Sequence, residues 1–494
     1  MPQSEADRKR NPALLYIHEV NKKHIAFLSI LSLTLSLPLI SSQAAPPRLS
    51  CKSNFENGNL AIKGTILSRL QQSRVSGIDK LWSKGINGAG QTIAVMGYGN
   101  FLLSDIDTFK ACNNLSNKLT IKSVSKRPFE SINDDSSSEW ILDIQTAMSL
   151  APGADIVYYK ADSIYGALNA AAVDNEADII TSSFGNLPLC EGLDPGAVGF
   201  NRLDALYKKL VQQGQTMLRG MGDMGTIACA TKGANPPDNL TPSIVTGAGS
   251  PWVTALSGIA ISQIEPLKAQ PWNSSTKGAG GGSGISIFAQ RPAWQNAPGF
   301  DPAITKRVSP DFVVQSVHTI VFQNGKWKLS GGDSMNGPFM SGVFATIAQS
   351  CSNGKSDYRL GWLNPALYAM AQDNLGFADI TTGKNMSFGY GGFDAKVGHD
   401  LASGLGTIDA KTFATNLCNY VAKTPRDIYF NSDQSTPTFT TIPPPTPAPT
   451  PATASKPTPA TDANKSVTIT CVKGKLTAKV SGINASCPKG YKKK

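Results

Sequence analysis

Apolar and polar residues follow two rhythms through the middle of the chain. Short, nearly continuous apolar runs occupy residues 92–99 (TIAVMGYG), 154–161 (ADIVYYKA), 177–185 (ADIITSSFG) and 216–225 (TMLRGMGDMG). Between them, residues 139–150, 164–177 and 201–214 have the 3.6-residue period of amphipathic helices. Buried strands that alternate with helices are typical of a parallel sheet covered by helices. The pattern therefore predicts an α/β domain with a mainly parallel, buried sheet.

Glycine and serine cluster where several of these predicted strands end, in GYG, SSFG and GMGDMG. Ligands of such sheets usually bind beyond the carboxyl ends of the strands. We therefore expect the functional site at this edge.

The composition changes after residue 425. Residues 426–464 are rich in proline and threonine, which predicts an extended spacer without a core. Residues 465–494 alternate well enough for one small hairpin, which needs the staple of Cys471 and Cys487 because it is too small to fold firmly alone. With the leader described next, four parts are expected: residues 1–45, a main domain at 46–425, the linker at 426–464 and the tail at 465–494.

The first 45 residues have the layout of a secretory signal peptide. Lys22 and Lys23 precede an apolar run from Ile25 to Ile40, and small residues follow up to Ala45. The run is shorter than the roughly 20 residues that span a bilayer, so we expect cleavage and export rather than a membrane anchor. No later segment is long enough to span a membrane.

Charge and cysteine content narrow the function further. The net charge is +11, but residues 465–494 hold eight lysines and no acidic residue, whereas residues 46–464 carry only +1. A nucleic-acid-binding core is therefore not expected, and the tail is a candidate for binding an anionic cell-envelope polymer or for keeping the protein soluble. The eight cysteines form no C-x-x-C cluster, which in an exported chain favours disulfides over metal ligation.

One serine, Ser334 in SGGDSMNGPFMSG, stands among glycines just before an apolar run and is a candidate nucleophile. The nucleophile elbow G-x-S-x-G does not fit, because Asn336 stands where glycine is needed. A serine needs a base, usually histidine. Outside the leader only His318 and His399 are available, and His318 lies in an apolar run that predicts a strand position.

Carboxylates are the alternative base. Glu139 and Asp143 are four residues apart, so both project from one helix face, which continues through Thr146 and Ala147 and is apolar enough to be buried. Two carboxyls this close share a proton and suit an acidic medium. The same spacing also fits a capping acid on a solvated face. A third acid, Asp223, lies between glycines after a predicted strand, where a neutral carboxyl could donate to an oxyanion.

Together these residues resemble the sedolisin family, the serine-carboxyl peptidases with a subtilisin-like fold. GGDSMNGP matches the family motif G-T-S-x-x-x-P with Ser334 and Pro338, although Asp333 stands where threonine is usual. Glu139 and Asp143, followed by APGADIVYY, match the family's acidic helix, and Asp223 matches its G-D-x-G motif. Further similarity in SSFG, SPWVTALSG, GGGSGISIFAQRPAWQ and RVSPDF extends it from about residue 93 to residue 406.

The resemblance implies a role for each matching residue. Glu139 is expected to be the general base for Ser334, Asp143 to share its proton, and Asp223 to hold the oxyanion with the Ser334 amide. A peptide substrate is expected to pair with the backbone of Ser183, Phe184 and Gly185. The family's calcium site corresponds to the carboxylates of Asp379 and Asp400 and the carbonyls of Ile380, Lys396 and Gly398, which suit one structural Ca²⁺; the alternative is a loop with two exposed aspartates. His399 is then structural.

The leading hypothesis is a secreted, monomeric serine endopeptidase that cleaves proteins or peptides at acidic pH through an acyl-enzyme on Ser334. The alternative from another class is a catalytically silent relative that serves as a binding module displayed at the cell surface.

Overall fold

A mainly parallel sheet organises the chain. The computed structural model describes residues 51, 66–132, 137–183, 190–231, 237–274, 278–355, 357–430, 467–473, 476–482 and 492–493. In the large sheet the strand order is β15-β16-β12-β6-β5-β4-β1-β3-β2, and β7 pairs with β6. Only the β15–β16 and β6–β7 pairs are antiparallel. The expected α/β class with a subtilisin-like parallel sheet is confirmed.

The strands of this sheet match the apolar runs of the sequence. In the centre, Val95 of β1 lies between Tyr158 of β3 and Thr181 of β4, all in parallel register. The strand bounds are β1 (Thr92–Gly97), β2 (Leu119–Ser123), β3 (Asp155–Lys160), β4 (Ile179–Ser182), β5 (Thr216–Gly220), β6 (Thr254–Gln263), β7 (Lys268–Pro271), β12 (Phe312–Gln315), β15 (Phe377–Ala378) and β16 (Thr407–Ile408).

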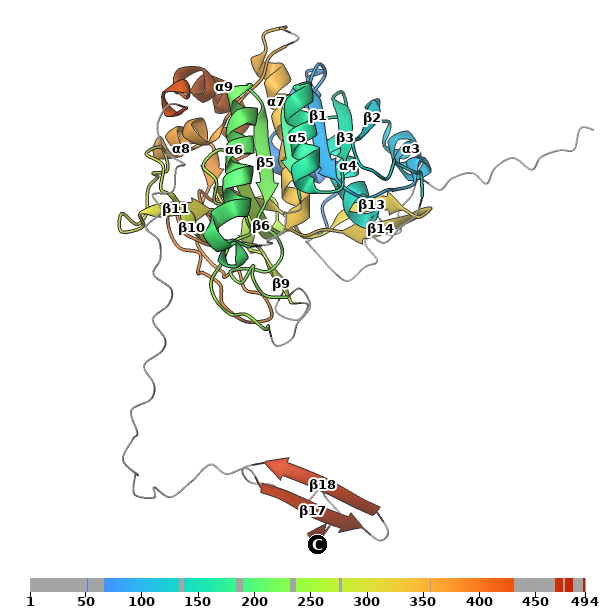
Figure 1. Ribbon diagram of the computed structural model, residues 1–494, viewed down its shortest axis with the longest axis vertical. Helices are drawn as coiled ribbons and strands as arrows, with labels where there is room; N and C mark the ends of the chain where they lie inside the picture. Colours follow the sequence, from blue (N-terminus) through green and yellow to red (C-terminus); the bar gives the residue numbers. More distant parts are fainter. Residues whose placement is uncertain are drawn as a thin grey trace, which may run out of the picture. The chain divides into compact units, whose positions relative to one another are not determined.

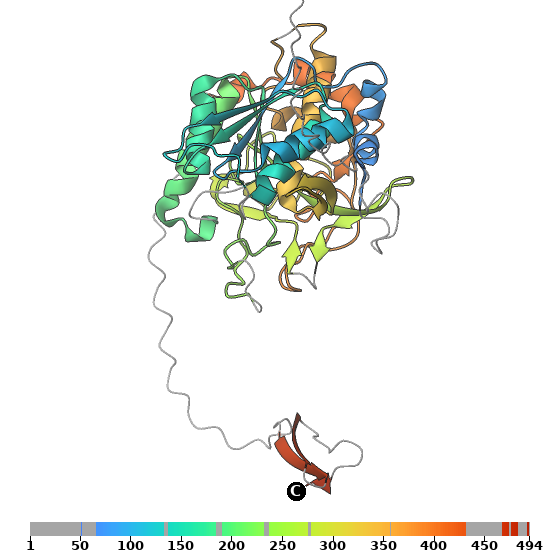
Figure 2. The same ribbon diagram turned by 90° about the vertical axis from the view of Figure 1, so that its right-hand side faces the viewer.

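Helices cover both faces of the sheet. α5 (Ile164–Asp174) and α6 (Val198–Gln212) pack on one face, and α4 (Ser137–Leu150) and α7 (Asn336–Cys351) pack on the other (Figures 1 and 2). The predicted helices at 139–150, 164–177 and 201–214 are thus confirmed. The remaining helices are α1 (Arg69–Ser76), α2 (Asp79–Trp82), α3 (Leu103–Asn113), α8 (Asn364–Gln372) and α9 (Phe413–Lys423).

α7 is the central buried helix. Every residue from Asn336 to Ala348 is buried, which explains its apolar composition. A side-chain carbon on Gly342 would lie 2.9 Å from the carbonyl oxygen of Ala147, so glycine is needed where α7 approaches α4. Pro338 stands in the first turn, where a missing N–H removes no helical hydrogen bond. The sequence thus allows α7 to begin beside α4 and to run through the core.

Smaller sheets surround the core. Three two-stranded pairs are formed by β8 (Asn273–Ser274) with β9 (Ala279–Gly280), β10 (Gly284–Gln290) with β11 (Lys306–Ser309), and β13 (Thr319–Gln323) with β14 (Lys326–Ser330). In the tail, β17 (Val467–Lys473) pairs with β18 (Leu476–Gly482) as expected. The expectation of a single hairpin was incomplete, because β19 (Lys492–Lys493) adds a third strand along β17.

Disulfides confirm the interpretation of the cysteines. Cys190 is bonded to Cys229 and Cys351 to Cys418, and Cys51 and Cys112 are also disulfide-bonded. The expected staple between Cys471 and Cys487 involves a residue outside the described part of the chain. In that described part, no helix combines the length and the apolar character needed to cross a membrane.

Candidate active site

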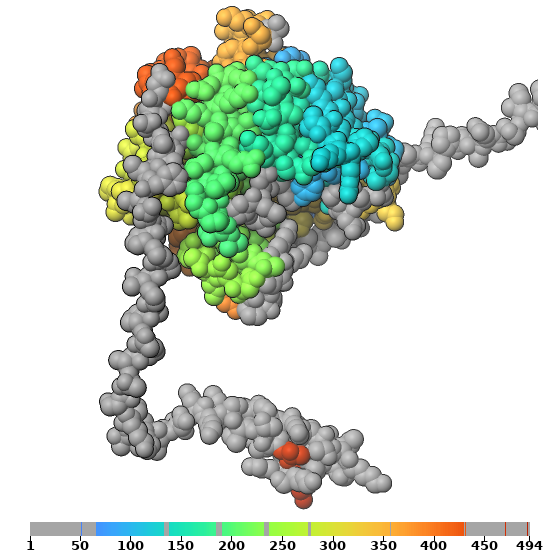
Figure 3. All heavy atoms as spheres, in the orientation of Figure 1, coloured from blue at the N-terminus to red at the C-terminus, as the bar shows by residue number. Residues whose placement is uncertain are grey.

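Residues from several strand ends meet at the carboxyl edge of the sheet. Ser183 directly follows β4, Asp223 lies three residues after β5, and Tyr98 directly follows β1. In Figure 1 the arrow of β5 points toward the lower end of the domain, where the loops that follow it gather. Figure 3 shows these light-green loops projecting beyond α6. These residues therefore lie at the edge of the sheet where the functional site is expected.

The acidic face of α4 lies against this edge. Asp143 is fully buried, as are Thr146 and Ala147 on the same face, and Glu139 is half-buried one turn before. The interpretation of a burying face is therefore correct, and the alternative of a solvated one is wrong. Burial, followed by the negative charge of Glu139, holds the pKa of Asp143 well above its ordinary value of 3.8.

Ser183 connects Asp143 to the candidate nucleophile. Its Oγ lies 2.8 Å from Asp143 Oδ2 and 2.9 Å from the carbonyl oxygen of Ser334. A carbonyl oxygen only accepts, and a hydroxyl has only one proton. When Ser183 donates to the Ser334 carbonyl, the contact with Asp143 needs a proton on the carboxyl, in agreement with its raised pKa. The Ser183 hydroxyl was not singled out in the sequence, where only its backbone was expected to act.

Tyr98 is a further neighbour of this acidic pair. Its ring meets that of Trp140 edge-to-face, with the ring centroids 4.9 Å apart. Burial and the charge of Glu139 raise the pKa of the Tyr98 phenol. The GYG motif after the first strand marked this position as part of a strand end but gave no indication of its proximity to Glu139.

Ser334 lies in a short 3-10 helix, Asp333–Met335, that leads into α7. Gly332 precedes it with φ +115°, a conformation that favours glycine. A side-chain carbon on Gly332 would lie 3.0 Å from Asp223 Oδ1, so a larger residue would crowd this carboxyl. The backbone N–H of Asp333 donates to Asp223 Oδ1 at 2.8 Å. Asp223 therefore lies against the residue that precedes the nucleophile.

His318 and His399, the two histidines considered as a base for Ser334, have different surroundings. The expectation of a strand position for His318 was wrong: it lies in the loop between β12 and β13 with φ +56°. His399 is buried, and its ring packs on Phe300 at a centroid distance of 4.4 Å. Burial, then the charges of Arg307 and Lys396, lowers the pKa of His399 to about 3, so its imidazole is neutral above that pH.

The candidate calcium residues all lie in the long loop between β15 and β16. Gly398 N donates to Asp379 Oδ2 at 2.8 Å, and Lys396 N donates to Asp400 Oδ2 at 2.9 Å. Asp400 Oδ1 accepts three further bonds, from Ala402 N and from the N and Oγ of Ser403.

The donor chemistry of this loop is compatible with a hard cation. Its two carboxylates and the nearby carbonyls are oxygen donors, which Ca²⁺ prefers. Within the described ranges no three His, Cys, Asp or Glu side chains converge. Carbonyl oxygens, such as those of Ile380, Lys396 and Gly398, would therefore have to complete the shell.

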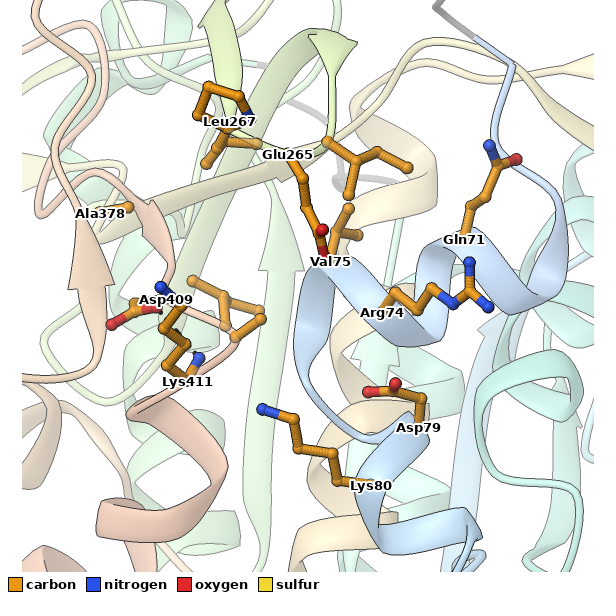
Figure 4. Close-up of a pocket in the computed structure, with 14 residues that line it drawn as sticks. Gln71, Arg74, Val75, Asp79, Lys80, Glu265, Leu267, Ala378, Asp409 and Lys411 are labelled. Carbon is orange, nitrogen blue, oxygen red and sulfur yellow. Dashed lines mark hydrogen bonds between the residues drawn. The ribbon is translucent and has the colours of Figure 1, made fainter.

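A groove of about 890 Å³ lies elsewhere, between the α1–α2 segment, the β6–β7 turn and the chain around Ile408. Lys80 and Lys411 extend into it from opposite walls (Figure 4). Ser334 and the carboxyls described above do not line it, so its volume does not identify the active site. Of the expected substrate-binding residues, Ser183 is placed at the site, whereas Phe184 and Gly185 lie outside the described residues.

No protein-family model matches the chain. It is 28% identical over 346 residues to "Sedolisin" of Pseudomonas sp. (strain 101), a match that covers 65% of this chain and 57% of the relative. It is 27% identical to "Xanthomonalisin" of Xanthomonas sp. (strain T-22), with 62% of this chain and 41% of the relative covered. The chain thus spans about half the length of these curated relatives.

A solved structure of Pseudomonas sedolisin, described as a serine-carboxyl proteinase complexed with two molecules of pseudo-iodotyrostatin, has the same fold. The TM-score is 0.57 at 24% identity, and the match covers 68% of this chain and 93% of the solved one. The fold and the serine among carboxyls define the class of subtilisin-like α/β proteins with a serine-carboxyl site. Within that class, the chain is similar to members of the sedolisin family, at 27–28% identity over about two thirds of its length.

Proposed function

We propose that the protein is a secreted serine endopeptidase that hydrolyses peptide bonds in proteins or peptides at acidic pH. One observation carries the proposal: the buried carboxyl of Asp143 is joined through Ser183 to the backbone of Ser334. A fully buried acid linked in this way, one helical turn from Glu139, suits a site that works with protons on its carboxyls.

In the proposed mechanism, Ser334 Oγ passes its proton to Glu139 while it attacks the carbonyl carbon of the peptide. Asp143 carries a proton next to Glu139, which limits the negative charge of the pair to one. The carbonyl oxygen becomes an oxyanion that accepts from the Ser334 amide and from a protonated Asp223. Oδ1 of Asp223 already accepts from the backbone, so its proton belongs on Oδ2.

The intermediate then breaks the C–N bond. Glu139 returns the proton to the leaving amine, which departs and leaves an ester on Ser334 Oγ. Water repeats the sequence: it gives a proton to Glu139 as it attacks the ester, and the proton returns to Ser334 Oγ as the acid product leaves. Histidine is not required at any step, which agrees with the neutral, buried state of His399.

Hydrolysis of a fluorescently labelled denatured protein between about pH 3 and pH 6 tests the proposal. Ser334→Ala and Glu139→Gln should each lower kcat by about a thousandfold or more. Matched controls are Ser83→Ala and Glu265→Gln, which alter an exposed serine and an exposed carboxylate of the groove that Ser334 does not line. A wild-type protein as inert as both variants, in the presence of calcium, would support the silent binding module instead.

We further propose that Asp379 and Asp400 hold one Ca²⁺ together with backbone carbonyls. When bound, the ion would supply positive charge to a loop whose Asp400 carboxyl is only 3% exposed. The proposal is supported by the oxygen-only donor set and by the bonds from Gly398 and Lys396 that orient the two carboxylates.

For the tail we propose attachment to an anionic cell-envelope polymer, supported by the eight lysines in residues 465–494. Retention of the full chain on an immobilised anionic polymer at low salt should be lost when residues 465–494 are deleted. Equal retention of both chains would refute the attachment.

A further inference from the structure

Asp333, the residue before the candidate nucleophile, has its carboxyl fully buried. Its Oδ2 accepts from the backbone N–H of Gly282 at 2.8 Å and from Ser257 Oγ at 3.1 Å. Ser257 belongs to β6, and Gly282 precedes β10. The Asp333 side chain therefore ties the turn that carries Ser334 to two segments that are distant in the sequence.

The other oxygen of Asp333 takes part in a chain of hydrogen bonds. Its Oδ1 lies 3.3 Å from Ser316 Oγ, and Ser316 Oγ lies 2.6 Å from Asn336 Oδ1. The amide oxygen of Asn336 only accepts, so the single proton of the Ser316 hydroxyl belongs in that bond. When the Ser316 proton lies in that bond, the contact between Ser316 and Asp333 needs a proton on Asp333 Oδ1. In that arrangement Asp333 is a donor at one oxygen and an acceptor at the other.

The surroundings of Asp333 favour this neutral form. A side-chain carbon on Gly258 would lie only 2.6 Å from Asp333 Oδ1 and 2.2 Å from Ser316 Oγ, so the contact surface is closely packed. Burial is the largest cause that raises the pKa of Asp333 well above 3.8, and Asp223 raises it further whenever its own carboxyl is ionised. The other groups that face it from β6, the loop after β12, the segment before β10 and α7 are uncharged: Ser257, Ser316, Gly282 N and Asn336.

Asp333 has two connections to the reacting groups. Ser334 is its neighbour in the chain, and its own backbone N–H donates to Asp223. A shift of the Asp333 side chain would therefore move both the nucleophile and the oxyanion acid. We propose that Asp333 is a positioning residue of the peptidase site, and that its protonated carboxyl fixes the turn presenting Ser334 and, through the backbone, the carboxyl of Asp223.

This inference rests on the proposed peptidase function and makes a distinct prediction. Asparagine has the shape of aspartic acid and can reproduce the pattern, because its oxygen can accept from Gly282 N and Ser257 while its NH₂ donates to Ser316. Alanine can do neither and leaves two buried donors without an acceptor. A positioning role for the neutral acid therefore predicts rescue by asparagine, whereas a role for a negative charge does not.

The experiment compares Asp333→Asn, Asp333→Ala and Ser316→Ala with the wild type in hydrolysis of labelled denatured protein at about pH 4. Asp333→Asn should keep kcat within about threefold, Asp333→Ala should lose about a hundredfold in kcat with little change in KM, and Ser316→Ala should lose about tenfold. Affinity for a peptide aldehyde, which forms a hemiacetal with a nucleophilic serine, should fall in parallel. Asp105→Asn is the matched control, because it alters a buried carboxyl that accepts two backbone bonds away from the site.

Different outcomes separate the two proposals. An inactive wild type would refute the peptidase function and the role of Asp333 together. An active wild type with Asp333→Asn as impaired as Asp333→Ala would overturn only the protonated positioning role. Full activity of Asp333→Ala would likewise overturn the positioning role of Asp333 and leave the peptidase function standing. If Asp333→Ala does not fold, the other two variants still test the proposal. Loss of activity in Asp333→Asn, or full activity in Ser316→Ala, contradicts it.

Discussion

A clear pH dependence of stability is expected from Glu191, a buried acid outside the catalytic group. Its side chain is 2% exposed, its Oε2 accepts from Ile287 N at 2.8 Å, and Ser286 Oγ lies within 3.0 Å of both carboxyl oxygens. It follows Cys190, which is disulfide-bonded to Cys229. Burial raises the pKa of Glu191 from its ordinary value of 4.5 to about 8, against the lowering effect of these hydrogen bonds.

The sign of the effect follows from this direction. An acid whose pKa is higher in the folded than in the unfolded state makes the protein more stable at low pH, where it is protonated in both states, than at high pH, where the folded state must hold it ionised. That contribution is complete below about pH 4.5 and is lost as the pH rises through about 8. Since one pKa unit corresponds to about 1.4 kcal/mol, Glu191 alone should lower the free energy of unfolding by about 2 kcal/mol at pH 6 and about 3 kcal/mol at pH 7, relative to pH 4.

Glu191→Gln removes the titration and keeps the shape of the side chain. Urea unfolding followed by tryptophan fluorescence, at about pH 4, 6 and 7, gives the free energy of unfolding of both proteins. The advantage of the variant over the wild type should grow by about 3 kcal/mol between pH 4 and pH 7. Other titrating groups cancel in this difference because both proteins share them. Asp107→Asn, at an exposed position on α3, should show no such trend. A difference between wild type and Glu191→Gln that stays constant with pH would refute the reasoning.

Three further predictions concern other contacts. Ser183→Ala removes the bridge between Asp143 and the Ser334 carbonyl and should lower kcat about tenfold at unchanged fold, measured with the same protein substrate; an unchanged kcat would deny the bridge a role. Asp311→Asn leaves the fully buried guanidinium of Arg307 without the carboxylate that lies 2.7 Å away. Urea unfolding should show a loss of about 3 to 5 kcal/mol in the free energy of unfolding, and a loss below 1 kcal/mol would contradict this estimate. Chelation of calcium should lower Tm, and Asp400→Asn should abolish the effect of added Ca²⁺ on Tm; equal calcium responses would contradict the site.

The sequence predicted those parts of the fold and site that depend on local patterns. The helix period alone placed Glu139 and Asp143 on one face, and the apolar runs identified the central strands. The interpretation of His318 failed because it lies in a turn with positive φ that has no glycine or proline to mark it, inside an otherwise strand-like run. Local patterning cannot detect a turn that the surrounding structure imposes.

Contacts between distant segments could not be predicted in the same way. The socket of Asp333 brings together β6, the loop after β12 and the segment before β10, and Ser257 is 76 residues away in the chain. Serines and glycines are common, and only the register of β6 with β12 makes these particular ones neighbours. The sequence showed an unusual acid beside Ser334, but its environment depends on tertiary packing.

Protonated, buried carboxyls serve both the proposed reaction and the stability of the fold. Asp143, Glu191 and Asp333 are all buried, and burial is the largest cause of the raised pKa at each. Each therefore stabilises the folded state at acidic pH and loses that contribution as the pH rises. Lowered pKa values, as at Asp174 beside Lys122, act in the opposite direction, but that pair is solvent-exposed and such pairs contribute little. The balance favours the acidic side, so activity and stability should decline together toward neutral pH because both require neutral carboxyls in the core.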